Sequence, residues 1–283
     1  MKFSPMKELL TEARKGGYAV PSFCAWNAET LLAVLETAET MQAPVIVMNG
    51  PAELGLLSLE IFARIAREIA SGFSVPAALH LDHGDSLELI RRAIASGYTS
   101  VMLDFSLRPF DENASAMKEA VEMARPYGVT VEGEIGHVGK VDSVTAEGSG
   151  GSTLTTPQEA ADFAAKTGID AMAVSIGNAH GQYTRLPEFD FARLSAIGSA
   201  VATPLVLHGG SGTPDADIRR AISLGMVKIN VATDLVTSWR ESLRTQWNAG
   251  RNMWAPMAMA DARKAMLPVI ERWIRLTGAE GHA

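Results

Sequence analysis

The stretch PLVLHGGSGTPDADIRRAISLGMVKINVAT, residues Pro204–Thr233, places two short apolar runs on either side of a longer amphipathic segment. The runs Pro204–Gly209 and Met226–Ala232 are rich in Val, Leu, Ile and Met, as strands buried on both faces usually are. Asp215–Leu224 between them is expected to be a helix, and the Gly225 that follows is a common helix C-terminal signal. The stretch therefore predicts two parallel strands joined by a crossover helix.

The same alternation of apolar runs and amphipathic segments extends over the rest of the chain. Further strands are expected at Tyr18–Phe23, Pro44–Asn49, Pro76–Asp82, Ser100–Ser106, Val129–Gly136 and Ala171–Ile176. Further helices are expected at Glu29–Met41, Ser86–Ser96, Glu112–Ala124 and Pro157–Lys166. Eight strands in strict alternation favour a closed barrel over an open doubly wound sheet, and no G-x-G-x-x-G follows the first strand. The sequence therefore predicts an α/β fold, a (β/α)8 TIM barrel with a C-terminal helical extension from about residue 234.

Length and composition fit one large soluble domain. The chain has 283 residues, of which 47% are hydrophobic and 20% charged, and its longest Gly/Ser-rich stretch, Glu147–Ser152, is too short to separate two domains. We therefore expect a single domain over residues 1–283. The net charge is −7 and the sequence has no basic cluster, which argues against nucleic acid and acidic membranes as partners. A single cysteine, no signal-like apolar core and no membrane-spanning stretch lead us to expect a cytoplasmic protein.

Three histidines stand where expected strands end, and each is followed directly by glycine. His83 follows the third strand, His180 comes shortly after the sixth, and His208 lies at the end of the seventh. The carboxyl ends of the strands form the active face of a (β/α)8 barrel, so the three imidazoles can converge there. Neutral imidazoles bind zinc well, and three protein ligands leave one position open for a substrate. The alternative is that each histidine caps a strand or satisfies a loop carbonyl.

The glycine-rich stretch after the seventh strand indicates a phosphate site. His208–Gly212 is followed by Thr213-Pro214, which opens directly into the expected helix. Backbone N–H groups at such a turn and at a helix N-terminus bind anions, and phosphate sites after strands seven and eight are frequent in this fold. A tight turn that needs glycine for its own conformation is the alternative.

Several motifs together resemble one enzyme family. They are HLDHG at His80–Gly84, Glu132-Gly-Glu134, the run Ser175–Gly181, VLHGGSG at Val206–Gly212 and KINVAT at Lys228–Thr233. In combination they resemble the class II, metal-dependent fructose- and tagatose-bisphosphate aldolase family, from about Met1 to beyond Thr233. The resemblance implies reversible cleavage of a ketose (bis)phosphate to dihydroxyacetone phosphate and an aldehyde, with zinc stabilising the enediolate.

The resemblance also implies roles for individual residues. It assigns the catalytic zinc to three ligands, His83, His180 and His208. Asp104 and Glu134 would bind the metal in a second, more buried position, and Asp82 would exchange a proton with the aldehyde-derived hydroxyl. Orienting His83 is an alternative or additional role for Asp82. A dihydroxyacetone phosphate moiety would be surrounded by Gly181, Gly209, Gly210, Ser211, Asn230, Val231, Ala232 and Thr233. A monovalent cation, Na⁺ or K⁺, near that phosphate and a homodimer or homotetramer are also implied.

The sequence departs from the family pattern at a few positions. Ungapped counting from Glu134 places Asp142 where relatives carry the glutamate that transfers a proton at the enediolate carbon, and Glu147 is the other candidate. Cys24 stands where many relatives have asparagine, and Phe105 where relatives usually have glycine. No site for a second phosphate is assignable. Arg108 and Arg185 are candidates by location only, and solvated arginines are the alternative.

Two other functions stay open at this point. A zinc-dependent hydrolase or isomerase on the same fold would often carry an H-x-H pair on its first strand, where this chain has Cys24-Ala-Trp26. A non-catalytic accessory subunit should lose metal ligands, whereas all three histidines are present. Fold alone does not choose among these functions.

Overall fold

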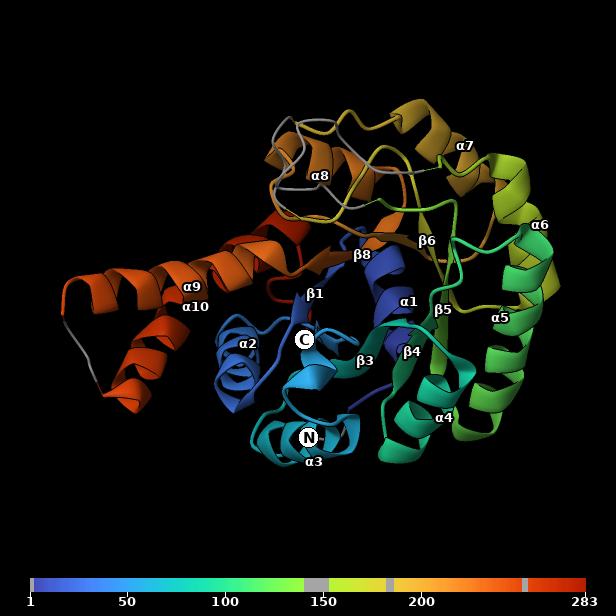
Figure 1. Cartoon of the computed structure of the whole chain (residues 1–283). Coiled ribbons are helices and arrows are strands. Elements are labelled where there is room, and N and C mark those ends of the chain that lie inside the picture. The colour runs from blue at the N-terminus through green and yellow to red at the C-terminus, as the bar shows by residue number, and fades with distance from the viewer. Residues whose placement is uncertain (1–2, 140–152, 182–185, 251–253) are drawn as a thin grey trace.

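Eight parallel strands close into a barrel in which each strand pairs with the next along the chain and β8 pairs with β1 (Figure 1). The computed structural model describes residues 3–139, 153–181, 186–250 and 254–283. The strands are β1 (Val20–Cys24), β2 (Val45–Asn49), β3 (Ala77–Gly84), β4 (Ser100–Leu103), β5 (Thr130–Ile135), β6 (Ala171–Val174), β7 (Leu205–Leu207) and β8 (Met226–Val231). The (β/α)8 barrel expected from the sequence is confirmed, and every expected strand is present with ends that differ by a few residues.

The expected strand Ser100–Ser106 ends early, at Leu103, so Asp104 lies on the loop after β4 and not on the strand itself. Its Oδ1 accepts hydrogen bonds from the backbone N–H of Ser106 at 3.1 Å and from the Ser106 hydroxyl at 2.7 Å. An Asp side chain bonded to the backbone two residues on forms a local turn, which takes the chain out of the sheet. The turn keeps Asp104 at the carboxyl end of the barrel.

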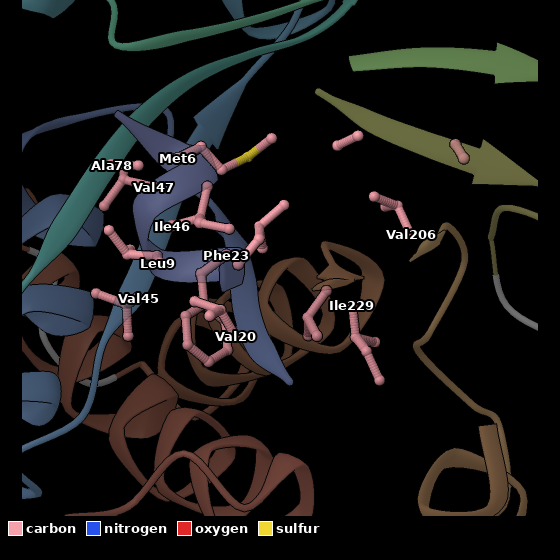
Figure 2. Close-up of a cluster of buried hydrophobic side chains, with 14 of the residues drawn as sticks. Met6, Leu9, Val20, Phe23, Val45, Ile46, Val47, Ala78, Val206 and Ile229 are labelled. Carbon is pink, nitrogen blue, oxygen red and sulfur yellow. The ribbon is translucent and has the colours of Figure 1, made fainter. Parts of the chain in front are cut away.

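The helix α1 (Met6–Gly16), which precedes the first strand, packs against the amino-terminal end of the barrel. Met6 and Leu9 are buried in a cluster with side chains of β1, β2, β3, β7 and β8 (Figure 2). The backbone N–H of Ser4 donates to the carbonyl of Ala77, at the start of β3. Apolar side chains therefore fill this end of the barrel, and polar groups are left for the opposite end.

The helices that follow the strands form an outer ring. They are α2 (Ala28–Thr40), α3 (Leu59–Ala70), α4 (Leu87–Ser96), α5 (Phe110–Ala124), α6 (Pro157–Thr167), α7 (Phe191–Ala200) and α8 (Asp215–Ser223), with short 3₁₀ turns at Glu53–Gly55 and Arg125–Tyr127. Capping boxes begin α2, at Asn27 and Thr30, and α6, at Thr156 and Glu159. The expected helices are all present, and the sequence pattern left α3 and α7 unassigned.

The C-terminal region consists of α9 (Thr233–Asn248) and α10 (Ala255–Thr277), so the helical extension expected from about residue 234 is present. Figure 1 shows α9 leading away from the barrel and α10 leading back to it. The returning part of α10 packs against α2, α8 and β1, and its Trp273 is fully buried. α10 therefore completes the ring between α8 and α2. Among the described residues, no helix is long and apolar enough to cross a membrane.

Candidate active site

The three histidines meet at the carboxyl end of the barrel. His83 lies at the end of β3, His180 on the loop after β6, and His208 directly after β7. One nitrogen from each ring lies within 4.8 Å of the others. The ring centroids are 4.9 Å apart for His83 and His180, and 4.7 Å apart for His83 and His208. Strands that are far apart in sequence thus bring three imidazoles to one point.

The backbone of His83 is in a conformation that non-glycine residues rarely adopt. Its φ is +47°, and the register of β3 against β4 shifts between Leu81 and Gly84. A residue held at positive φ costs free energy and persists where the surrounding structure fixes it, as functional sites often do. His83 stands at this irregularity with its ring close to the other two histidines.

Asp104 fixes the ring of His83 from one side. The Asp104 Oδ2 and His83 Nδ1 atoms are 2.7 Å apart. Burial alone would raise the pKa of Asp104, but the hydrogen bond and charge of His83 hold it well below its usual value. The other ring nitrogen, His83 Nε2, is buried and has no hydrogen-bond partner in the described part of the chain. Such an atom is unusual in a folded protein, and a metal ion is one group that would satisfy it.

His208 is fully buried between two glutamates of β5. Its Nδ1 is 3.0 Å from Glu134 Oε2, and its Nε2 is 2.9 Å from Glu132 Oε1. Burial alone would lower the pKa of His208, but hydrogen bonds to the two carboxylates raise it to about 10. Both ring nitrogens therefore face carboxylates, and a metal bound to His208 would take the place of one of these contacts while the remaining carboxylate orients the ring.

His180 has the opposite electrostatic setting. Burial and the nearby His83 and His208 lower the pKa of His180 to about 3. The imidazole is therefore neutral at pH 7, which is the form that binds metal ions. Its backbone N–H donates to the carbonyl of Gly139 at 2.8 Å, which anchors the loop that carries it.

These donors fit a divalent transition metal. Three imidazoles form one candidate set, and His83, Asp104 and Glu134 form a second set, each with ligand atoms within 4.8 Å of one another. Nitrogen and carboxylate donors with an open position are typical of catalytic zinc sites. The residues expected from the sequence to bind metal are therefore all brought together.

A buried lysine lies beneath this cluster. Lys228 Nζ is 2.8 Å from Glu132 Oε2 and 3.5 Å from His80 Nε2. His80, Asp82 and Glu132 also have metal-ligand spacing, but the Lys228 ammonium already lies among them. Burial alone would raise the pKa of Glu132, but Lys228 and the neighbouring histidines lower it to about 2. The ion pair holds Glu132 ionised against His208.

Asp82 faces a cavity of about 410 Å³ at the mouth of the barrel. Its Oδ1 accepts a hydrogen bond from Asn230 Nδ2 at 3.0 Å, and its Oδ2 is 3.9 Å from His83 Nε2. Burial alone would raise the pKa of Asp82, but the charge of His83 and a hydrogen bond from His80 hold it well below its usual value. Asp82 is therefore an ionised carboxylate beside the histidines.

The glycine-rich loop after β7 packs closely against its neighbours. Gly209 has a φ of +68°, and a Cβ there would lie 2.0 Å from the Ala179 carbonyl oxygen. The N–H of Gly210 donates to the Asn230 carbonyl at 3.0 Å. A second cavity, of about 350 Å³, is lined by Gly181, Ser211, Gly212, Thr233, Asp234, Thr237, Ser238, Val269 and Arg272.

The residues expected to surround dihydroxyacetone phosphate are thus spread over two places. Gly181, Ser211 and Thr233 line the second cavity, whereas Ala232 lines the cavity beside Asp82. Val231 is buried on β8. The remaining members, Gly209, Gly210 and Asn230, hold the loop and Asp82 through backbone packing and hydrogen bonds.

Residues 4–282 match the family model described as fructose-bisphosphate aldolase class-II. The chain belongs to the class II fructose-bisphosphate aldolase family. The protein is therefore an aldolase, a lyase that acts on a carbon–carbon bond, and its family is metal-dependent. The family resemblance seen in the sequence motifs is confirmed.

Individual relatives agree over nearly the whole length of the aldolase. The D-tagatose-1,6-bisphosphate aldolase subunit GatY of Klebsiella oxytoca is 40% identical over 276 residues, which is 97% of each chain. The YdjI aldolase from Escherichia coli K12 has a TM-score of 0.87 and 34% identity over 99% of each chain. A fructose-bisphosphate aldolase from Campylobacter jejuni shares the fold, with a TM-score of 0.83 and 21% identity over 98% of this chain and 95% of that one.

Some residues of the aldolase site escaped the sequence analysis. Lys228 was seen only as part of a motif, although a lysine inside an apolar strand is a signal for a buried partner. Glu53 and Asp85 stand in no motif of the sequence, yet both line the cavity beside Asp82. Their positions depend on loops whose course no local pattern specifies.

Other expected residues lie apart from the site or outside the described chain. Asp142, Glu147 and Arg185 fall outside the described residues. Phe105 is half-buried and packs against the hydrophobic core, and exposed Arg108 lies over its ring, 5.4 Å from the centroid. Phe105 is absent from the residues that line the cavity beside Asp82.

Proposed function

We propose that this aldolase reversibly cleaves a ketose phosphate to dihydroxyacetone phosphate and an aldehyde, with zinc held by His83, His180 and His208. The supporting observation is the convergence of three imidazole nitrogens within 4.8 Å, one of which, His83 Nε2, is buried without a hydrogen-bond partner in the described chain. Bound zinc would supply Lewis-acid stabilisation of the negative charge that cleavage leaves on the substrate. Asp104 and Glu134 would hold the metal in a second, more buried position.

Asp82 would serve as the general base at the aldehyde end. It is ionised, faces the cavity, and is held in place through Oδ1 by Asn230. In cleavage it would take the proton of the C4 hydroxyl, and in condensation it would return that proton. A second acid–base group at the enediolate carbon would come from Asp142, with Glu147 as the alternative.

The phosphate of the dihydroxyacetone half would bind near the loop after β7. Support comes from Ser211 and Thr233, which line the second cavity, and from α9, which begins at Thr233. Backbone N–H groups at a helix N-terminus favour anions. A monovalent cation, Na⁺ or K⁺, would complete the neutralisation of this phosphate.

Chelation is the direct test of the proposed function. Dihydroxyacetone phosphate release from ketose 1-phosphates and ketose bisphosphates is measured in a coupled assay, before and after treatment with a chelator. We expect the loss of at least about 99% of activity on chelation, because metal-ion stabilisation contributes several kcal/mol to the transition state. Added zinc should restore the activity. Cleavage that persists without metal, or no cleavage of any ketose phosphate, would contradict the proposal.

Substituting Asp82 tests the base. Asp82→Asn keeps the shape and the hydrogen bond from Asn230 but cannot take a proton. We expect kcat to fall about 10²- to 10⁴-fold, the usual contribution of a positioned general base. Zinc content should stay at the wild-type level. The matched control is Asp111→Asn, an exposed residue in the first turn of α5. If kcat is unchanged in Asp82→Asn, a residue other than Asp82 transfers this proton.

A homodimer or homotetramer is the assembly we propose. The support is a set of exposed apolar side chains on and between α9 and α10: Val236, Trp247, Trp254, Met257 and Met259. Large exposed aromatic residues are enriched at subunit interfaces. The name of the GatY relative describes that protein as a subunit, so an accessory role for this chain is the second candidate. Cleavage by the purified chain alone would decide against it.

A further inference from the structure

The two cavities have no lining residue in common, and only the larger one is lined by His83 and His180. The cavity of about 350 Å³ adjoins the loops after β6, β7 and β8, where the proposed phosphate end of the substrate binds. The cavity of about 410 Å³ adjoins the ends of β1 to β4, together with His137, Val138, His180 and Ala232. We call the cavity of about 410 Å³ the distal cavity. If dihydroxyacetone phosphate occupies the cavity of about 350 Å³, the distal cavity receives the aldehyde half of the substrate.

Four carboxylates face the distal cavity. Glu53, Asp82, Asp85 and Asp104 line it, and within the described part of the chain no lysine or arginine does. Glu53 is fixed in place, because its Oε2 accepts a hydrogen bond from the Gly50 N–H at 2.8 Å. Two of the four, Asp82 and Asp104, already have partners within the proposed active site, so Glu53 and Asp85 set the charge of the outer wall.

The Cys24 thiol lies in the same wall as Glu53 and Asp82. Cys24 is buried at the end of β1 and lines the same space. Burial, reinforced by the charges of Glu53 and Asp82, raises the pKa of the Cys24 thiol well above its usual value. The charges of Glu53 and Asp82 would act in the same direction on a phosphate bound beside Cys24.

Two described cations of this part of the barrel are committed elsewhere. Lys228 Nζ is paired with Glu132 at 2.8 Å beneath the histidines. Arg108 is exposed and lies over the Phe105 ring. Neither lines the distal cavity. A phosphate group placed there would therefore meet carboxylates, whereas sugar hydroxyls would find hydrogen-bond acceptors.

We propose that the distal cavity binds the aldehyde half as an uncharged, hydroxylated chain, so that the preferred substrate is a ketose 1-phosphate without a second phosphate. Glu53 and Asp85 select against the bisphosphate by repulsion and accept hydrogen bonds from hydroxyl groups. The amide of Asn49, whose Oδ1 accepts a hydrogen bond from the Tyr98 hydroxyl at 2.8 Å, adds a fixed polar group to the same wall. This inference rests on the proposed function.

The test compares matched substrate pairs on the zinc-loaded enzyme. Fructose 1-phosphate is compared with fructose 1,6-bisphosphate, and tagatose 1-phosphate with tagatose 1,6-bisphosphate, by the rate of dihydroxyacetone phosphate formation. We expect kcat/KM to be at least about tenfold higher for the monophosphate of each pair, because like charges brought together cost several kcal/mol and 1.4 kcal/mol is tenfold. Equal values, or a preference for the bisphosphates, would overturn the inference.

Proton exchange separates failure of the inference from failure of the proposed function. Exchange of the dihydroxyacetone phosphate C–H protons in D₂O needs no aldehyde, so it reports on the phosphate half alone. If the enzyme catalyses this exchange but prefers the bisphosphates, the proposed function is supported and the distal-cavity inference is wrong. If the protein catalyses neither exchange nor cleavage, the proposed function is wrong, and the inference that rests on it is wrong too.

Charge-neutral variants test the selecting residues. Glu53→Gln keeps an acceptor for the Gly50 N–H, and Asp85→Asn keeps the side-chain size. Each is expected to raise the bisphosphate-to-monophosphate ratio of kcat/KM about three- to tenfold, as removal of one nearby charge in a partly solvated site should. The control, Glu112→Gln on the exposed start of α5, should leave the ratio unchanged. An unchanged ratio in both cavity variants would overturn the proposal.

Two basic residues that lie outside the described residues allow a test of the opposite hypothesis, that a distal phosphate is bound. Lys140 and Arg185 are each replaced by alanine in the zinc-loaded enzyme. If either variant loses bisphosphate cleavage more than about tenfold while retaining monophosphate cleavage, that residue binds a distal phosphate and the inference is overturned. Parallel effects on both substrates are the expected result.

Discussion

Replacing His180 by alanine is expected to lower kcat/KM for ketose phosphate cleavage by about 10³-fold or more, because metal-ion stabilisation of the transition state contributes several kcal/mol. His180 is the cleanest of the three histidines to remove. It is only partly buried and neutral, whereas the rings of His83 and His208 are bonded to carboxylates. We expect zinc content, measured by elemental analysis after dialysis, to fall in parallel with activity.

The control for this variant is His282→Ala. His282 stacks on Tyr18 near the C-terminus, with ring centroids 4.2 Å apart, and has no part in the proposed site. Activity and zinc content should stay at wild-type levels there. The thermal unfolding midpoint of His180→Ala should also stay close to that of the wild-type apoprotein. A His180→Ala protein that retains both zinc and full activity would mean that the metal is held by other donors.

Replacing Lys228 by methionine is expected to lower the free energy of unfolding by about 3–5 kcal/mol, the usual cost of leaving one partner of a buried ion pair alone. Lys228 and Glu132 are both fully buried, and their charged atoms are 2.8 Å apart. The change would leave Glu132 with His208 as its main remaining cation. Chemical denaturation of the metal-free protein measures the effect directly.

The double variant separates charge from packing. Lys228→Met combined with Glu132→Gln removes both charges, so it should recover part of the lost stability. The matched single control is Lys118→Met on the exposed face of α5, for which the change should be within about 0.5 kcal/mol. If Lys228→Met costs less than about 1 kcal/mol, the ion pair contributes little to the folded state.

The fold was predictable because buried parallel strands have a strong local signature. Runs such as Pro204–Gly209 and Met226–Ala232 are apolar throughout, and glycines mark the ends of several intervening helices. α1 is amphipathic, but that pattern alone does not reveal that it packs against one end of the barrel. The strand ends shifted where a side chain forms its own turn, as Asp104 does with Ser106.

The site was predictable only in part, for a physical reason. His83 and His208 lie at strand ends and His180 on the loop after β6, so the barrel brings all three to its carboxyl face. The Lys228–Glu132 pair depends instead on which inward-facing residues of β8 and β5 meet across the interior, and that depends on the register and tilt of the strands. The distal cavity depends on the loop that follows β2, whose course is set by the local hydrogen bond between Gly50 and Glu53 and by the close packing of Gly50 against Asp82 of β3.

The spacing of the histidines is set by main chain more than by side chains. Gly209 follows His208, Ala179 precedes His180, and a single methyl group at position 209 would collide with the Ala179 carbonyl oxygen at 2.0 Å. The distal cavity shares His83 and His180 with the proposed metal site, but its wall also includes Cys24 at the end of β1 and Glu53 and Asp85 on the loops after β2 and β3. Descendants of this sequence can therefore exchange the residues that choose the aldehyde without moving the metal ligands. Substrate range and metal chemistry are free to evolve separately on this scaffold.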